Sequence, residues 1–187
     1  MARSLEGGIV MIIQMDWSVL HWFQNHRTKF LDTFMPIITR LGNAGIVWFI
    51  IIISMFLVPR MRMSAIAGFL AMAIDAVLCN LIVKPLVARP RPFSVQYLTE
   101  LLINAPKDTS FPSGHTSASF AVTFALCFTG SPFWIPCLVL AILIGVSRMY
   151  LYVHYFTDVF IGAALGVVCG AVGSALAVPV FLYLTEL

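Results

Sequence analysis

The sequence predicts an all-α protein that is embedded in a membrane as a polytopic bundle of about six helices, the first of them weak or interfacial. Of its 187 residues, 60% are hydrophobic and only 10% are charged, whereas a soluble domain carries roughly 25% charged residues. The mean hydropathy of +0.97 agrees with this fold class. The length suits a single domain covering residues 1–187.

Residues 1–42 form the weak first part of this domain, and residues 44–184 are its expected core. An apolar run at 9–13 is followed by Trp17 and Trp22, each beside a polar or charged residue. This pattern is typical of an interfacial amphipathic helix or of a poorly hydrophobic first span. Residues 9–30 therefore either lie on the membrane or cross it.

Five apolar segments follow, with one long polar connection among them. The segments are residues 46–58, 64–83, 114–130, 133–146 and 156–184. About 20 apolar residues suffice to cross a bilayer. The connection, residues 84–112, opens with three prolines in nine residues, which rules out a regular helix there. In the last segment, Gly162, Gly166 and Gly170 recur every four residues, as in closely packed membrane helices.

Alternation of the spans brings the polar groups together. If successive segments cross in opposite directions, the segment ends at Lys84, His115, Arg148 and His154 all reach the same membrane face. The short loop with Arg60 and Arg62 then lies on the other face, which the positive-inside rule makes cytoplasmic. A site on the extracytoplasmic face of the plasma membrane is expected.

The three basic residues that precede the segment 46–58 favour the opposite orientation. They are Arg27, Lys29 and Arg40.

His154 and Asp158 are predicted to form a functional pair. They are four residues apart, so on a helix they share one face. A carboxylate that holds one imidazole N–H leaves the other nitrogen as a lone pair, which suits a nucleophile or base. Arg148 would lie on another face of a continuous helix. We therefore expect a break between Arg148 and His154.

The cations predict a phosphate site. Lys84, Arg91 and Arg148 would repel one another without an anion, and arginine matches phosphate oxygens with a bidentate fork. Ser113 is the expected N-cap of the helix that begins there, and the free N–H groups near Ser113 and Gly114 would bind an anion.

These groups predict phosphoryl transfer. His154 attacks phosphorus, the cations and N–H groups neutralise the equatorial oxygens, and His115 protonates the leaving oxygen. Water then hydrolyses the phosphohistidine, with His115 as the base. No carboxylate cluster suits Mg²⁺, so no metal or other cofactor is expected.

Three spaced motifs resemble the signatures of the type 2 phosphatidic acid phosphatase (PAP2) superfamily. They are Lys84 with Arg91-Pro92, then Pro112-Ser113-Gly114-His115, then Ser147-Arg148 with His154 and Asp158. The resemblance covers roughly residues 44–175. It implies a six-helix membrane bundle with its site near the outer face, and the phosphohistidine roles already assigned.

The resemblance also implies a substrate class, a phosphate-bearing lipid of the bilayer. The small size is similar to that of bacterial enzymes for undecaprenyl diphosphate, phosphatidylglycerol phosphate or phosphatidic acid, of which we favour the first. One alternative is a phosphatase or phosphotransferase for a soluble phosphorylated metabolite. Another is a non-catalytic membrane protein that binds phosphate or lipid head groups.

Other partners and charged residues receive simpler interpretations. Nucleic acid is excluded because no basic face extends from the membrane, and no pattern predicts an oligomeric state. Arg89 and Lys107 are expected to solvate the loop or attract an acidic head group. Asp75 lies nine residues before Lys84, on the opposite helical face, which favours a buried structural pairing over a role in chemistry.

Overall fold

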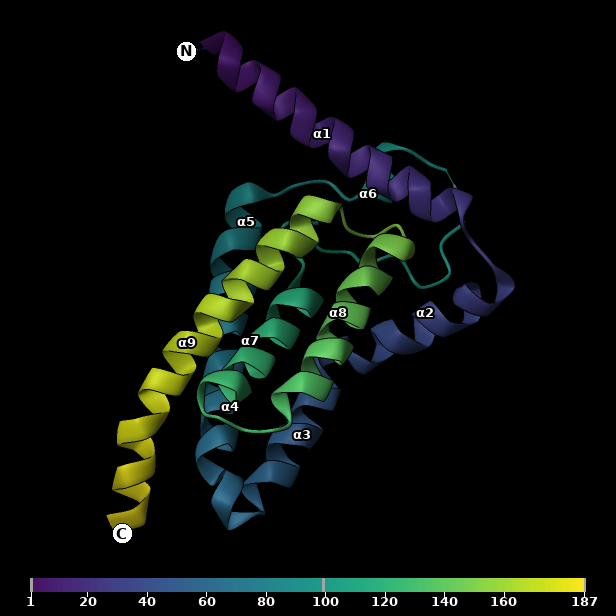
Figure 1. Ribbon diagram of the computed structural model, residues 1–187. Coiled ribbons are helices and arrows are strands. Elements are labelled where there is room, and N and C mark those ends of the chain that lie inside the picture. The colour runs from purple at the N-terminus through teal and green to yellow at the C-terminus, as the bar shows by residue number, and fades with distance from the viewer. Residues whose placement is uncertain (1, 99, 187) are drawn as a thin grey trace.

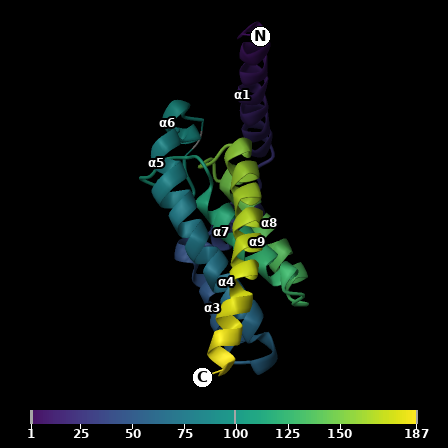
Figure 2. The same ribbon diagram turned by 90° about the vertical axis from the view of Figure 1, so that its left-hand side faces the viewer.

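The computed structural model describes residues 2–98 and 100–186, and no strand occurs among them. The helices form a bundle whose two ends are clearly distinguished (Figure 1). The N-terminus of the chain extends beyond one end, and the C-terminus lies at the other (Figures 1 and 2). The predicted all-helical bundle is confirmed.

Residues 1–42 contain two helices. α1 (Ala2–Asn25) projects from the bundle at the end where the functional motifs gather (Figure 2). α2 (Lys29–Leu41) is capped by Thr28, whose hydroxyl accepts a hydrogen bond from Leu31 N. Asp16 and Leu20, both fully buried, anchor the second half of α1.

The segment 46–58 is followed by a long helix whose winding changes along its length. A one-turn 3₁₀ helix (Asn43–Gly45) leads into α3 (Ile46–Phe56), and a second one (Pro59–Met61) makes the turn into α4 (Arg62–Asp75). α4 continues as a π-helix (Ala76–Val83) and then as α5 (Lys84–Val87).

The predicted irregular connection is confirmed, apart from two short helices. α5 has Pro85 in its first turn, and α6 (Pro92–Val95) starts with Pro92. Proline is tolerated in the first turn of a helix, where its missing N–H has no partner to lose.

Three helices complete the bundle. α7 (Gly114–Phe128) and α9 (Phe156–Glu186) pack against α4 and against each other, and α8 (Trp134–Tyr150) packs against α7. The glycines of α9 pack against backbone, as predicted: a Cβ on Gly166 would lie 2.3 Å from Ser117 O of α7, and one on Gly173 would lie 2.5 Å from Ala71 N of α4.

Two helical stretches among the described residues are long and apolar enough to cross a membrane, Pro59–Val95 and Phe156–Leu184. A third results if Lys29–Leu41 and Asn43–Phe56, bent by 49°, form one broken span. Trp134–Tyr150 is a shorter apolar helix. α1 is not among these stretches.

Candidate active site

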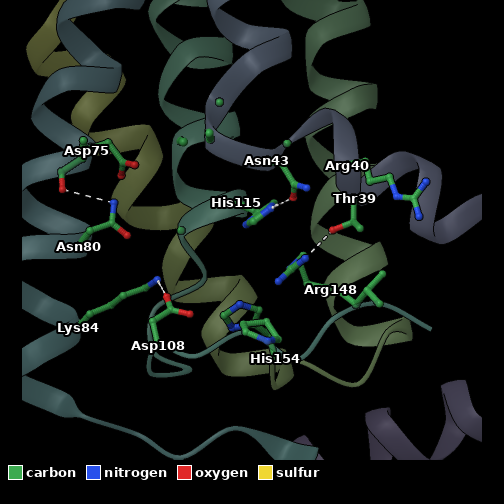
Figure 3. A pocket seen from close by; sticks show the side chains of 18 of the residues that line it. Thr39, Arg40, Asn43, Asp75, Asn80, Lys84, Asp108, His115, Arg148 and His154 are labelled. Carbon is green, nitrogen blue, oxygen red and sulfur yellow. Dashed lines mark hydrogen bonds and ion pairs between the residues drawn. The ribbon is translucent and has the colours of Figure 1, made fainter. Parts of the chain in front are cut away.

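A cavity of about 1010 Å³ lies where α7 and α9 begin and α8 ends, beside Lys84 (Figure 3). The predicted site residues that line it are Lys84, Arg91, Gly114, His115, Arg148 and His154. The predicted gathering of these groups at one site is therefore confirmed.

The predicted break between Arg148 and His154 is also confirmed. α8 ends at Tyr150, and α9 begins only at Phe156. The intervening turn includes Tyr152 at φ 61°. It folds back so that the amides of Val153 and His154 donate to Arg148 O, at 3.2 and 3.3 Å. This reversal places both side chains at the same cavity.

His154 and Asp158 meet, but not by the predicted helical spacing. His154 precedes α9, and its Nδ1 lies 3.5 Å from Asp158 Oδ2. This contact is longer than a good hydrogen bond. Burial lowers the pKa of His154 to about 3; the contact with Asp158 opposes this shift, and the charges of Arg148 and Arg91 reinforce it. His154 is therefore a neutral imidazole at physiological pH.

The other nitrogen of His154 contacts Arg91. Nε2 lies 3.1 Å from Arg91 Nη1. A guanidinium can only donate, so Nε2 carries the lone pair and Nδ1 carries the hydrogen. This is the tautomer that a nucleophile at Nε2 needs.

Arg89 does not solvate the loop, contrary to the sequence-based expectation. Its guanidinium lies 2.7 Å from Asp158 Oδ1 and 2.7 Å from Asp16 Oδ2. Its Cζ lies 3.8 Å from the centre of the Tyr155 ring. Both carboxylates are fully buried, so the arginine is their counter-ion. Sequence reasoning could not detect this pairing, because Asp16 is more than 70 positions away from Arg89.

Further hydrogen bonds fix the carboxylate of Asp158. Ser110 Oγ donates to Oδ2, as does Tyr155 N at 2.9 Å. Asp16 in turn accepts from Thr157 N at 2.8 Å, in the first turn of α9. A chain of polar contacts thus runs from α1 through Arg89 and Asp158 to His154.

Lys84 and Arg91 share one carboxylate, that of Asp108. Lys84 Nζ pairs with its Oδ2 (Figure 3). Arg91 Nη2 lies 2.7 Å from its Oδ1. Burial of Asp108 favours its neutral form, but Lys84 and Arg91 outweigh this effect and hold the pKa of Asp108 well below its usual range. Asp108 was not among the residues predicted for the site.

His115 faces the cavity from the first turn of α7, and its Nε2 lies 2.9 Å from Asn43 Oδ1 (Figure 3). With the amide oxygen as acceptor, Nε2 carries the hydrogen. Gly42 packs against the same ring, because a Cβ there would lie 2.9 Å from His115 Cδ2. Asn43 is a second site residue that the sequence did not reveal.

Arg148 is almost fully buried and is held by α2. Its Nη1 donates to Thr39 Oγ1 at 2.6 Å (Figure 3). Its Nε is buried and has no hydrogen-bond partner among the described residues. Arg148 lines the cavity, and this buried N–H is left without a hydrogen bond.

The start of α7 differs in part from the prediction. Ser113 occupies the N-cap position, but its side chain makes no capping hydrogen bond and accepts instead from Thr116 Oγ1 at 2.9 Å. Its N–H donates to Asp158 O at 3.0 Å, so this amide is already used. Gly114 lines the cavity as expected, and a Cβ there would lie 3.6 Å from Lys84 Nζ.

Asp75 was predicted to lie on the opposite face from Lys84, and this was wrong. Both line the cavity. The π-helix between them has more residues per turn than an α-helix, which rotates Lys84 toward the side of Asp75. The predicted structural pairing of Asp75 is confirmed, because it accepts a hydrogen bond from buried Ser117 of α7.

Among the described residues, no three His, Cys, Asp or Glu side chains are grouped as a metal site would require. The expectation that the protein uses no metal stays a prediction, since ligand grouping alone does not define a reaction.

Comparison with known proteins identifies the family. The model of the PAP2 superfamily matches residues 64–181, which contain all three motifs. The chain therefore belongs to the PAP2 superfamily, and the resemblance found in its motifs is confirmed.

The chain is similar to undecaprenyl-diphosphatase BcrC of Bacillus subtilis (strain 168). The two are 27% identical over 147 residues, which cover 78% of this chain and 75% of that protein.

Two solved structures share the fold. The crystal structure of Aquifex aeolicus LpxE has a TM-score of 0.73 at 29% identity, over 84% of this chain and 93% of that one. That of a transmembrane PAP2 type phosphatidylglycerolphosphate phosphatase from Bacillus subtilis has a TM-score of 0.69 at 26% identity, over 89% and 86%. The family match and these relatives together show that the protein is a membrane phosphatase that acts on lipid phosphates.

Proposed function

We propose that the protein hydrolyses a phosphate monoester or diphosphate carried by a membrane lipid, through a phosphohistidine on His154 and without a metal. The observation that carries this proposal is the lining of one cavity by His154, His115 and three cationic side chains. A site that only bound phosphate would not need a neutral imidazole beside an anchored carboxylate.

The proposed first step forms a bond from His154 Nε2 to phosphorus as the bond to the leaving oxygen breaks. Arg91 N–H, which contacts Nε2, turns to a phosphate oxygen and releases the lone pair. Asp158 stabilises the positive charge that develops on the imidazole. His115 supplies the proton for the leaving oxygen.

The second step returns the enzyme to its starting state. Water attacks the phosphohistidine, His115 takes the proton, and inorganic phosphate leaves as His154 becomes neutral again. Lys84, Arg91 and Arg148 stabilise the equatorial oxygens in both steps, a role supported by the position of all three at the cavity. Gly114 permits close approach of the phosphate to the start of α7.

The cavity lining supports a lipid substrate. Beyond the cations it includes Phe49 of α3 and Phe69 and Met72 of α4. Phe49 is 40% exposed and Phe69 is 51% exposed, so the apolar side of the cavity reaches the outer surface of the bundle. A freely soluble metabolite would not need this surface. Among the candidate lipids, the similarity to BcrC favours undecaprenyl diphosphate over phosphatidylglycerol phosphate and phosphatidic acid.

We place the site at the extracytoplasmic face of the plasma membrane. Arg60 and Arg62 lie at the other end of the bundle, in a short turn, and the positive-inside rule assigns that end to the cytoplasm. The C-terminus lies at the same end (Figure 1). Green fluorescent protein fused there is expected to fluoresce, and alkaline phosphatase fused there to stay inactive. The reverse pattern would show that the C-terminal end is extracytoplasmic and that the site faces the cytoplasm.

The activity test measures phosphate release in detergent with EDTA present. The substrates are undecaprenyl diphosphate, phosphatidylglycerol phosphate, phosphatidic acid and a panel of soluble sugar phosphates. Wild type is expected to release phosphate from a lipid, and His154→Ala is expected to lose this activity. His26→Ala is the matched control, because His26 is exposed and stacks on Trp22 outside the cavity.

A second assay tests the intermediate. Rapid acid-free quenching of wild type with ³²P-labelled substrate should trap an alkali-stable, acid-labile adduct that His154→Ala lacks. Hydrolysis that requires added metal, or that persists in His154→Ala, would contradict the mechanism. Preference for the sugar phosphates would indicate that the substrate is a soluble metabolite and not a lipid.

A further inference from the structure

The carboxylate of Asp108 lies at the place where the proposed function requires a phosphate. It bridges Lys84 and Arg91, the two cations contributed by the first motif. Arg91 is also joined to the nucleophile His154. Asp108 lines the same cavity, and its side chain is 51% exposed there.

The two oxygens of Asp108 use the donors that phosphate oxygens would use. A guanidinium and an ammonium recognise carboxylate and phosphate by the same charge-assisted hydrogen bonds. The two anions therefore exclude each other from Lys84 Nζ and Arg91 Nη2. Asp75, in the same cavity, differs because it is buried and accepts from the neutral hydroxyl of Ser117.

Arg91 does not depend on the Asp108 side chain for its position. Its Nε donates to the backbone oxygen of Asp108 at 2.8 Å, and its Nη1 donates to Val153 O at 2.7 Å. Movement of the Asp108 side chain would thus leave the guanidinium in place. Asp108 itself lies in the irregular segment between α6 and α7, where a change of side-chain rotamer disturbs no helix.

We propose that Asp108 is a resident competing anion that sets the charge specificity of the site. It carries one negative charge and is tethered beside Lys84 and Arg91. A terminal phosphate carries about −1.5 to −2 charges at pH 7 and offers three oxygens, so it displaces the carboxylate. The phosphodiester of an ordinary anionic phospholipid carries one charge and does not.

This inference rests on the proposed function for the identity of the ligand. It also explains how a cationic site beside a membrane could avoid being occupied by ordinary phospholipid head groups. The bilayer presents phosphodiester head groups at high local concentration. A cationic cavity without its own anion would be occupied by them. Asp108 keeps the cations paired until a more highly charged terminal phosphate arrives.

The test measures binding and does not depend on turnover. Purified wild type, Asp108→Asn and Asp108→Ser are titrated with inorganic phosphate at pH 7.5 by isothermal calorimetry. Titrations are repeated in micelles containing phosphatidylglycerol or phosphatidylcholine. Asp32→Asn is the matched control, since it removes the same charge from an ion pair with Arg27 outside the cavity. Size-exclusion profiles verify that each variant is folded.

Asp108→Asn and Asp108→Ser, which lack the negative charge of Asp108, are expected to bind phosphate at least about tenfold more tightly than wild type. The reason is that Lys84 and Arg91 lose the carboxylate that competes with phosphate. Phosphatidylglycerol should weaken phosphate binding in these variants, but not in wild type or Asp32→Asn. Unchanged or weaker phosphate binding in the folded variants, or binding in no variant, would overturn the proposal and make Asp108 a structural brace. Tighter binding without any lipid hydrolysis by wild type would instead reject the proposed function alone.

Discussion

Asp16 and Asp158, which belong to the first and the last helix, are ion-paired with the same guanidinium, that of Arg89, at 2.7 Å each. Because Asp158 contacts His154 through its other oxygen, Arg89 holds the carboxylate in place behind the proposed nucleophile. Arg89 does not line the cavity, so its effect on catalysis is indirect.

Arg89→Gln is therefore expected to reduce kcat by roughly 10- to 100-fold, the usual cost of losing a group that orients an active-site residue. KM should change little, because Arg89 does not contact the substrate. Steady-state kinetics on a lipid substrate measure both constants. Lys107→Gln, which removes the same charge from an exposed position in the same connection, is the control. A raised KM with unchanged kcat would instead indicate that Arg89 attracts the acidic head group of the substrate, as expected from the sequence.

Gly42→Ala tests the position of His115. The new Cβ would lie 2.9 Å from His115 Cδ2 and 3.2 Å from Ile144 Cγ2, so the imidazole must shift from Asn43. Misplacement of a catalytic group by a fraction of an ångström to 1 Å reduces kcat by roughly 10- to 100-fold. Gly8→Ala is the matched control, because nothing lies within 4 Å of a Cβ at Gly8. Equal kcat for the two variants would show that His115 tolerates displacement.

Gly166→Ala tests the packing of α9 on α7. A Cβ at Gly166 would meet Ser117 O at 2.3 Å and Ala121 N at 2.9 Å, and both are backbone atoms that cannot move away singly. Separating the two helices should cost about 1–3 kcal/mol, measured as a lower thermal unfolding midpoint in detergent. Gly7→Ala, with nothing within 4 Å of the new Cβ, should leave the midpoint unchanged.

The buried neutral imidazole of His154 predicts a pH dependence of stability. Its pKa is about 3 in the folded protein and about 6.5 in the unfolded chain. Between these values the unfolded chain binds the extra proton, so stability rises with pH. From pH 7 to pH 5, wild type should lose about 2 kcal/mol more than His154→Gln.

Thermal unfolding in detergent at the two pH values measures this difference. His26→Gln, which replaces an exposed histidine, is the control and should retain the wild-type pH response. An identical response of wild type and His154→Gln would mean that the pKa of His154 does not differ between the folded protein and the unfolded chain.

The sequence predicted those features of the site that depend on the order of spans and on local breaks. Alternation of apolar segments was sufficient to bring Lys84, His115 and His154 to one cavity. The six-residue spacing from Arg148 to His154 was sufficient to predict a break. Both inferences use only geometry that neighbouring residues determine.

The features that sequence reasoning missed depend on contacts between distant segments. Arg89 resembled a solvated loop residue because its partner Asp16 lies in α1. Asp108 lies in an irregular segment and Asn43 in a single 3₁₀ turn, and neither has a periodicity that assigns a direction to a side chain. The Asp75 error has another origin, since it assumed regular α-helical turns across a segment that winds as a π-helix.

That π-helix also affects how the protein tolerates insertions and deletions. It lies between Asp75, which is fixed to α7 through Ser117, and Lys84, which belongs to the first motif. A π-helix holds more residues per turn than an α-helix, so deleting one residue from the stretch 77–82 would let the segment rewind as a regular α-helix with Lys84 still near its present direction. Inserting one residue would instead rotate Lys84 relative to Asp75 by one further residue step, roughly 100° in an α-helix. Such an insertion would keep every motif residue and the hydrophobic character of the span, yet it would turn Lys84 away from the proposed phosphate site. Insertions within this helix are therefore more damaging than single-residue deletions there.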